Sequence, residues 1–198
     1  ITSSKALEAV SGGSLSVSST SVSVSAGDGM DVSGGESLSV SGGSVSVKSS
    51  SDVDVQSLKL KLTASDGVDV LTSGDLDMSS SSATLESTGA VSVSSGTSMS
   101  LSGESASVSV SSELEMTAEA ATVRAGESLN VYSGESMSVA SHDATMSVGG
   151  SMSAFAEDTT VMSSTLSVSA SQSVSVSTPD TGSVDVQTGS IGVAASGG

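Results

Sequence analysis

The one histidine of the chain, His142, stands between Ser141 and Asp143. Serine, histidine and aspartate are the residue types of a hydrolytic triad, in which the imidazole takes the serine proton and the carboxylate orients the imidazole. Such a site needs three side chains that converge in space, and three consecutive residues do not supply that geometry. We therefore predict that His142 is an exposed corner residue and that the chain has no catalytic residues.

Glu113 and Glu115 are the best candidates for paired-acid chemistry. Two residues apart on a strand, they lie on one face at about the separation that a retaining glycosidase needs. Carbohydrate-cleaving grooves also use aromatic and basic side chains, but the chain has one Tyr, one Phe and five Lys and Arg residues. Among the basic residues only Lys59 and Lys61 cluster. We interpret the two glutamates as charges of a solvated face, and we expect no enzyme activity.

Metal and cofactor chemistry is also not expected. The chain has no Cys and a single His, so it lacks the ligands of a structural zinc or iron–sulfur site. Outward carboxylates on neighbouring strands could share a calcium ion, but the Gly-Gly-x-Gly-x-Asp repeat of calcium-binding β-rolls does not occur. A phosphate-binding Gly-x-x-x-x-Gly-Lys loop is missing as well. We expect no metal and no cofactor.

The charge balance restricts the partners. With 22 acidic and 5 basic residues the chain carries a net charge of −17, which repels phosphate backbones and anionic lipid surfaces. The sequence contains no apolar run of the length that spans a bilayer. Nucleic acid and membrane insertion are therefore not expected.

The elements that carry these residues are copies of one short strand. The unit is apolar–polar–apolar followed by small or polar residues, and each step is seven or eight residues long. Three steps add up to 23 residues. Apolar residues therefore recur at this spacing, as in the series Val22, Val45, Val68, Val91, Leu114 and Met137. The seven- or eight-residue spacing becomes irregular after Met152, around residues 155–162, and is regular again at Leu166.

Alternation with a period of two predicts strands with one apolar and one polar face. We expect Leu38, Val40, Val45, Val47, Val68, Val70, Val91 and Val93 to be buried, and Ser39, Ser46, Asp69 and Ser92 to face solvent. Paired glycines such as Gly34-Gly35 predict corners with positive φ. A disordered Ser/Gly linker would not place Val, Leu or Met at every second position, so disorder is disfavoured.

Two architectures fit the period. A single chain can coil on itself and stack each residue on the residue 23 positions later, or three identical chains can intertwine. Asp31, Asp54 and Asp77 repeat at this spacing between apolar residues. A single-chain coil would place them ~4.8 Å apart, where like charges destabilise a sheet. An intertwined trimer would separate them by about 14 Å, beyond the Debye length. The charges therefore favour the homotrimer over the single-chain triangular coil.

Units such as 35–43, Gly-Glu-Ser-Leu-Ser-Val-Ser-Gly-Gly, resemble the octad repeats of triple-stranded β-helices in phage tail spikes and in VgrG-type needles of type VI secretion. The resemblance covers most of the chain and implies a stiff homotrimeric spike or fibre. It implies no catalytic residue.

The fold class that we predict is all-β, a β-helix (β-solenoid) with three short strands per turn of about 23 residues. Residues 1–12 would form an N-terminal cap or lead-in, with a short helical turn at 4–9. Residues 13–177 would form the regular β-helix, and 178–198 an irregular corner with a terminal strand.

The predicted function is that of a structural rod, spike or fibre component. Its partners would be further copies of the chain or neighbouring subunits of a larger assembly, and its place outside the cell or on a surface appendage. The alternative is a binding module, an adhesin stalk or an ice-binding solenoid that uses outward Ser and Thr ladders. We further expect residues 1–198 to be a segment of a longer rod or one protomer of a larger assembly.

Overall fold

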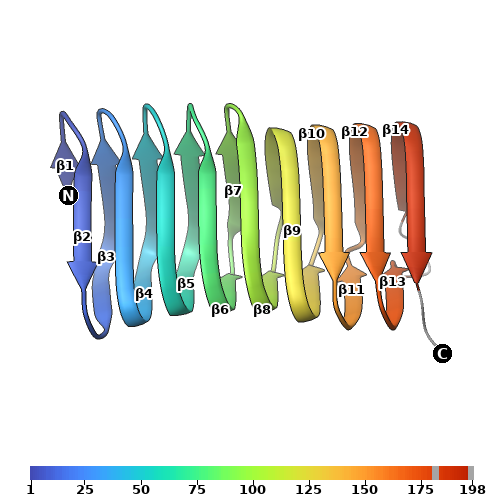
Figure 1. Ribbon diagram of the computed structural model, residues 1–198, viewed down its shortest axis with the longest axis horizontal. Coiled ribbons are helices and arrows are strands. Elements are labelled where there is room, and N and C mark those ends of the chain that lie inside the picture. Colours follow the sequence, from blue (N-terminus) through green and yellow to red (C-terminus); the bar gives the residue numbers. More distant parts are fainter. Residues whose placement is uncertain (180–182, 196–198) are drawn as a thin grey trace.

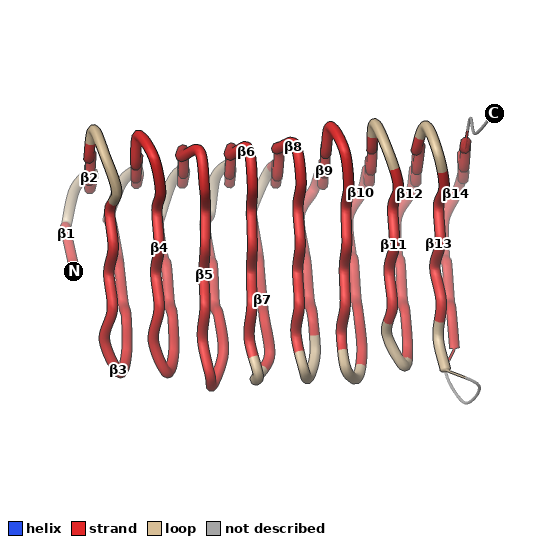
Figure 2. Tube along the Cα trace, turned by 90° about the horizontal axis from the view of Figure 1, so that it is seen from below, coloured by secondary structure: helices blue, strands red, loops and turns tan. Residues whose placement is uncertain are grey.

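The protein is an all-β solenoid of about 8 turns, described here from a computed structural model. Residues 1–179 and 183–195 are described. Successive coils stack side by side along one axis, and the first and last described strands lie at opposite ends of the rod (Figures 1 and 2). At a strand spacing of about 4.8 Å, eight coils give a rod roughly 38 Å long.

In the described part of the chain, fourteen strands make up one parallel sheet that winds around the axis. They are β1 (Thr2–Ser3), β2 (Leu7–Ser11), β3 (Leu15–Ala26), β4 (Met30–Ser49), β5 (Val53–Thr72), β6 (Leu76–Ser87), β7 (Ala90–Ser95), β8 (Ser98–Val110), β9 (Leu114–Ser133), β10 (Ser136–Val148), β11 (Ser151–Phe155), β12 (Asp158–Ala170), β13 (Ser173–Ser177) and β14 (Ser183–Ala195). The longer strands bend around corners of the coil.

The register follows the period of the sequence. Met30 of β4 pairs with Val53 of β5, and Val53 with Leu76 of β6, each 23 residues further on. The step shortens by one residue at a few places, as where Leu38 pairs with Leu60. The strands are therefore stacked copies of one coil, which confirms the predicted β-solenoid.

Each coil contributes three short segments, and we call the surfaces that they build the first, second and third face. The segments begin at the following residues, each paired with its neighbours in the list: Leu7, Met30, Val53, Leu76, Met99, Ala121, Ala144, Leu166 and Ile191 on the first face; Leu15, Leu38, Leu60, Ala83, Ala106, Leu129, Met152 and Val174 on the second; Val22, Val45, Val68, Val91, Leu114, Met137, Thr159 and Val184 on the third.

The core consists of columns of aliphatic side chains along the axis. Leu76, Leu114 and Leu129 are each 1% exposed, and full burial of such a side chain contributes about 1.5–3 kcal/mol. The burial of many aliphatic side chains, added over all coils, supplies the stability that large aromatic side chains supply in a globular core.

The predicted inside and outside are largely confirmed. Leu38, Val45, Val68, Val70, Val91 and Val93 are buried. Val40 and Val47 are half-buried but pack against the core. The four residues expected to face solvent, Ser39, Ser46, Asp69 and Ser92, are half-buried because neighbouring coils flank them on both sides.

Buried hydroxyls close many corners. Ser95 is 5% exposed, and its hydroxyl donates to the carbonyls of Gly74 on the preceding coil (2.7 Å) and Ser98 three residues on (2.8 Å). Ser49 and Ser133 make the same pair of bonds at other corners. Serine at a corner thus satisfies carbonyl groups that would otherwise be buried without a partner.

The glycine corners differ from the prediction in one respect. None of the described glycines has a positive φ. Some are needed instead because backbones approach closely: a Cβ on Gly103 would clash with the Ser80 carbonyl oxygen. Others, such as Gly12, have open space around the Cβ position.

Three other expectations are corrected or completed by the structure. One chain coils on itself, so Asp31, Asp54 and Asp77 do lie in register on adjacent coils, and the preference for intertwined chains was wrong. Residues 4–9 form no helical turn, because the side chains of Leu7–Ser11 alternate as a strand that pairs with β4. Of the predicted irregular corner, 180–182 and 196–198 lie outside the described residues, and Ser183–Ala195 is strand β14.

Candidate functional site

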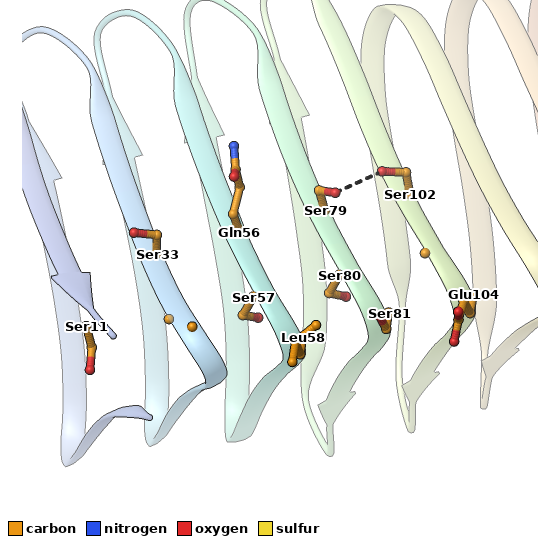
Figure 3. Close-up of a pocket in the computed structure, with 13 residues that line it drawn as sticks. Ser11, Ser33, Gln56, Ser57, Leu58, Ser79, Ser80, Ser81, Ser102 and Glu104 are labelled. Atoms are coloured by element: carbon orange, nitrogen blue, oxygen red, sulfur yellow. Dashed lines mark hydrogen bonds between the residues drawn. The ribbon is translucent and has the colours of Figure 1, made fainter. Parts of the chain in front are cut away.

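The outer surface has a shallow furrow of about 630 Å³ at the corner after the first face (Figure 3). Its floor is a column of small residues on five successive coils: Ser11, Gly34, Ser57, Ser80 and Gly103. Five coils at about 4.8 Å make the furrow roughly 19 Å long. It runs along the rod axis because the period repeats small residues at this corner.

The walls of the furrow are mostly polar. Gln56, Ser79 and Ser102 project on one side, and the Ser102 hydroxyl donates to that of Ser79 at 3.4 Å (Figure 3). Leu58, 56% exposed, and Glu104 stand on the other side. The furrow offers hydroxyl and amide groups for hydrogen bonds.

Two hydroxyls of the floor have no hydrogen-bond partner. The oxygens of Ser57 and Ser80 are buried and unpaired. Because these oxygens have almost no accessible surface, a molecule in the furrow could not reach them. Neither serine lies beside a histidine that could take its proton, and the furrow therefore has no activated nucleophile.

The first face carries a column of carboxylates. Asp31, Asp54 and Asp77 are paired in register on three successive coils. The side-chain amide of Gln56 donates to both oxygens of Asp54, at 3.1 and 3.0 Å. This contact and the surrounding water offset part of the repulsion within the column.

Acidic residues at the corners bind backbone groups of the next coil. One oxygen of Asp52 accepts from the Asp75 N–H at 2.9 Å. Asp75 in turn accepts from the N–H and the hydroxyl of Ser98, at 3.2 and 2.7 Å. These carboxylates link one coil to the next, and that role accounts for the Asp52/Asp75 repeat seen in the sequence.

Two lysines pair with acids on neighbouring coils. Lys48 lies 3.3 Å from Asp69 on the third face, and Lys61 lies 3.1 Å from Glu86 across the second face. All four side chains are about half exposed, so each pair contributes on the order of 0–1 kcal/mol. The Lys59/Lys61 cluster is thus part of the charged surface.

The residues considered for catalysis do not converge. His142 and Asp143 are exposed, as predicted, and the backbone carbonyl of His142 accepts a hydrogen bond from Ser163 at 3.1 Å. The Ser141 hydroxyl is buried and unpaired. Glu113 lies in the corner before β9 and Glu115 within it, and both side chains are exposed.

Sequence reasoning missed the pair formed by the two aromatic residues. Tyr132 of β9 and Phe155 of β11 are paired in register at outward positions of the second face. Their rings are parallel within 4° and their centroids lie 5.3 Å apart. The spacing of 23 residues between them could have revealed the contact.

Within residues 1–179 and 183–195, no three His, Cys, Asp or Glu side chains lie close enough together to hold a metal ion. Over the same residues, no helix has the length and hydropathy needed to cross a membrane. Comparisons with models of protein families, with curated proteins and with solved structures found no match to this chain.

Proposed function

We propose that the protein is a structural component of a rod, spike or fibre and that it has no catalytic role. The observation that supports this most strongly is the unbroken coil-on-coil pairing from β1 to β14. The backbone hydrogen bonds of a parallel sheet here run along the rod axis, so each coil is tied to the next over its whole circumference. Such an object resists stretching and bending, as a spike or fibre must.

The composition of the surface fits the same role. A net charge of −17 on a chain of 198 residues keeps the rods apart in solution and prevents adhesion to other acidic polymers. We place the protein outside the cell or on a surface appendage. The resemblance to phage tail spikes and VgrG-type needles supports the same mechanical role, although here the coils close on one chain.

The edge of the last described coil supports assembly along the axis. Val184, Ile191 and Val193 occupy inward positions but are 50, 58 and 60% exposed. Within the described residues β14 pairs on one side, with β12. An apolar coil edge is a template for a further strand, and we propose that another coil of the rod stacks on it.

Electron microscopy at increasing protein concentration tests this function. We expect short rods at low concentration and lengths that grow as coils stack end to end. Val193→Lys should reduce growth because it places a charge at the stacking edge. Ser167→Lys, an outward residue that pairs with Gly192, is the matched control and should not. Rods of one length at all concentrations, with the two variants alike, would contradict the proposal.

A binding module remains the second candidate, and the furrow is the observation that favours it. An adhesin stalk could hold an extended polar chain along roughly 19 Å of hydroxyl-lined corner, and an ice binder would use flat ladders of outward Ser and Thr. An ice-recrystallisation assay separates these from a purely mechanical rod. Inhibition of crystal growth at micromolar protein would favour ice binding, and unaltered growth would remove that alternative.

A further inference from the structure

The interior of the last coils, orange and red in Figure 1, is not filled. A cavity of about 300 Å³ lies there, lined by inward side chains of all three faces, among them Met146, Met152 and Met137. It reaches from Met116 on the third face to Val186, three coils further on. At about 4.8 Å a coil it is roughly 14 Å long. Its shape is that of a short tunnel along the rod axis.

The cavity exists because one inward column of the second face loses its leucines. In the middle of the rod this column holds Leu62 and Leu85, and the free space beside them is about 50 Å³. Further along the rod the same column holds Ala154 and Val176. Because the paired coils keep the surrounding walls apart, the volume that the smaller side chains leave does not collapse.

One hydroxyl belongs to this otherwise apolar lining. Thr159 takes an inward position of the third face, is 2% exposed and lines the cavity. Its hydroxyl oxygen is buried and has no hydrogen-bond partner. Among the described residues that line the cavity, Thr159 is the one with a hydroxyl, amide or charged side chain. A buried hydroxyl without a partner costs free energy, and a ligand that pairs with it would recover that cost.

Water is a poor partner for this hydroxyl. A buried water needs two to four polar partners, and the backbone groups of the surrounding strands are already paired between coils. An engineered apolar cavity of about 150 Å³ stays dry and binds benzene, and the cavity beside Thr159 has about twice that volume. Its size lies at the lower end of the range of small-molecule sites. A mainly apolar molecule therefore suits the cavity better than water does.

The lining also restricts the charge of a ligand. None of the described residues that line the cavity is charged, so a carboxylate or an ammonium group would be buried without a counter-ion. The methionines of the lining are flexible and adapt to the shape of an apolar guest. The lining thus favours an uncharged hydrocarbon with one polar group.

We propose that this cavity binds an uncharged, elongated aliphatic molecule with one hydroxyl or carbonyl group, such as a medium-chain alcohol. The alkyl chain lies along the rod axis, and its polar group forms a hydrogen bond with the Thr159 hydroxyl. Val184, Ile191 and Val193 line the cavity at the last described coil and are half or more exposed, so the ligand enters there. The proposal goes beyond the mechanical role of the rod and does not depend on it.

Methionine methyl groups report directly on binding. Of the eight methionines of the chain, four line the cavity: Met116, Met137, Met146 and Met152. In NMR spectra of protein with isotope-labelled methionine methyl groups, n-octanol should shift these four signals and saturate. Met30 near the other end of the rod and Met162, 49% exposed, should not shift. Octanoate should bind at least tenfold more weakly than n-octanol, because its charge would be buried. Low protein concentration, at which rods are short, separates binding from growth.

Two substitutions separate the hydroxyl from the space. Thr159→Val keeps the shape of the side chain, so it should weaken n-octanol about threefold or more and leave the binding of benzene, which does not use the hydroxyl, undiminished. Thr160→Val, the next residue and outward, is the matched control and should change neither affinity. Ala154→Leu restores the leucine that this column has in the middle coils and should abolish binding of both probes. Thermal melts check that each variant is folded.

The proposal would be overturned if n-octanol left the four methionine signals of the lining in place, or if all methionine signals drifted together without saturation. Equal n-octanol affinity in Thr159→Val and Thr160→Val would overturn the role of the hydroxyl. Octanoate that binds as well as n-octanol would overturn the preference for an uncharged ligand.

Discussion

Asp54 lies directly beside Asp77 on the next coil, with both carboxylates outward and in register. Asp31 continues the column on the other side of Asp54. Like charges opposite one another destabilise a sheet by a few tenths to about 1 kcal/mol. The rod tolerates this cost because its backbone pairing and its core are repeated in every coil.

Asp54, which has an acid on either side, should therefore be replaceable with a gain in stability. We predict that Asp54→Asn raises the free energy of unfolding by about 0.5 kcal/mol at low salt and by less at high salt. Chemical denaturation at two salt concentrations measures this. Asp143→Asn is the control, because Asp143 pairs with Ala120 and Thr165 rather than with another acid. Equal shifts for both variants would show that the column is not strained.

The core should not tolerate a charge. Val91 is 1% exposed in the third-face column, so Val91→Asp should cost several kcal/mol. Ser92→Asn, the next residue and outward, should change stability by less than about 0.5 kcal/mol. Ser92→Asp is a poor control, because it would place a carboxylate between Asp69 and Glu115. Thermal melts that shift equally for Val91→Asp and Ser92→Asn would contradict the assigned core.

Two buried serines should respond in opposite ways to the loss of the hydroxyl. Ser95→Ala removes the bonds to Gly74 and Ser98 and leaves buried carbonyls unpaired, so it should cost about 1–2 kcal/mol. Ser87 is equally buried, but its hydroxyl has no partner. Ser87→Ala should therefore be neutral or stabilising. An equal loss of unfolding free energy in the two variants, or no change in either, would disprove the corner role.

The effect of replacing a corner glycine should depend on the space around its Cβ position rather than on its φ angle. Gly103→Ala would drive a methyl group into the Ser80 carbonyl and should destabilise the chain by about 1–3 kcal/mol. Gly12→Ala meets open space, and it should be neutral or stabilise by up to about 1 kcal/mol. Urea midpoints for both variants check this, and a harmless Gly103→Ala would show that the corner can shift.

Much of the fold follows from the sequence because the period of 23 residues specifies both the coil and its inward side chains. Val22 through Met137 hold the same column in the structure. The period continues where the apolar signal fails: Thr159 takes the next position of this column, 2% exposed. Because threonine carries a hydroxyl, the apolar pattern of the sequence is interrupted at this position although the coil continues.

The choice between one chain and three could not be made from charge alone. The repulsion between Asp31, Asp54 and Asp77 is small beside the pairing of whole coils, and Gln56 offsets part of it. The corner hydroxyls were also hidden, because a serine that closes a corner and an outward serine look alike in so serine-rich a sequence. The contact between Tyr132 and Phe155 could have been predicted only by applying the period of 23 residues to the outward residues as well.

The most direct test of the single-chain rod is one distance along its axis. Ser23 and Ser138 lie in one outward column of the third face, five coils apart. Spin labels on Ser23→Cys and Ser138→Cys, diluted with unlabelled protein, should give a narrow distance distribution near ~24 Å, five spacings of about 4.8 Å. Intertwined chains would place the same residues about 72 Å apart. A long distance of that kind, or a broad distribution, would contradict the coil-on-coil stack.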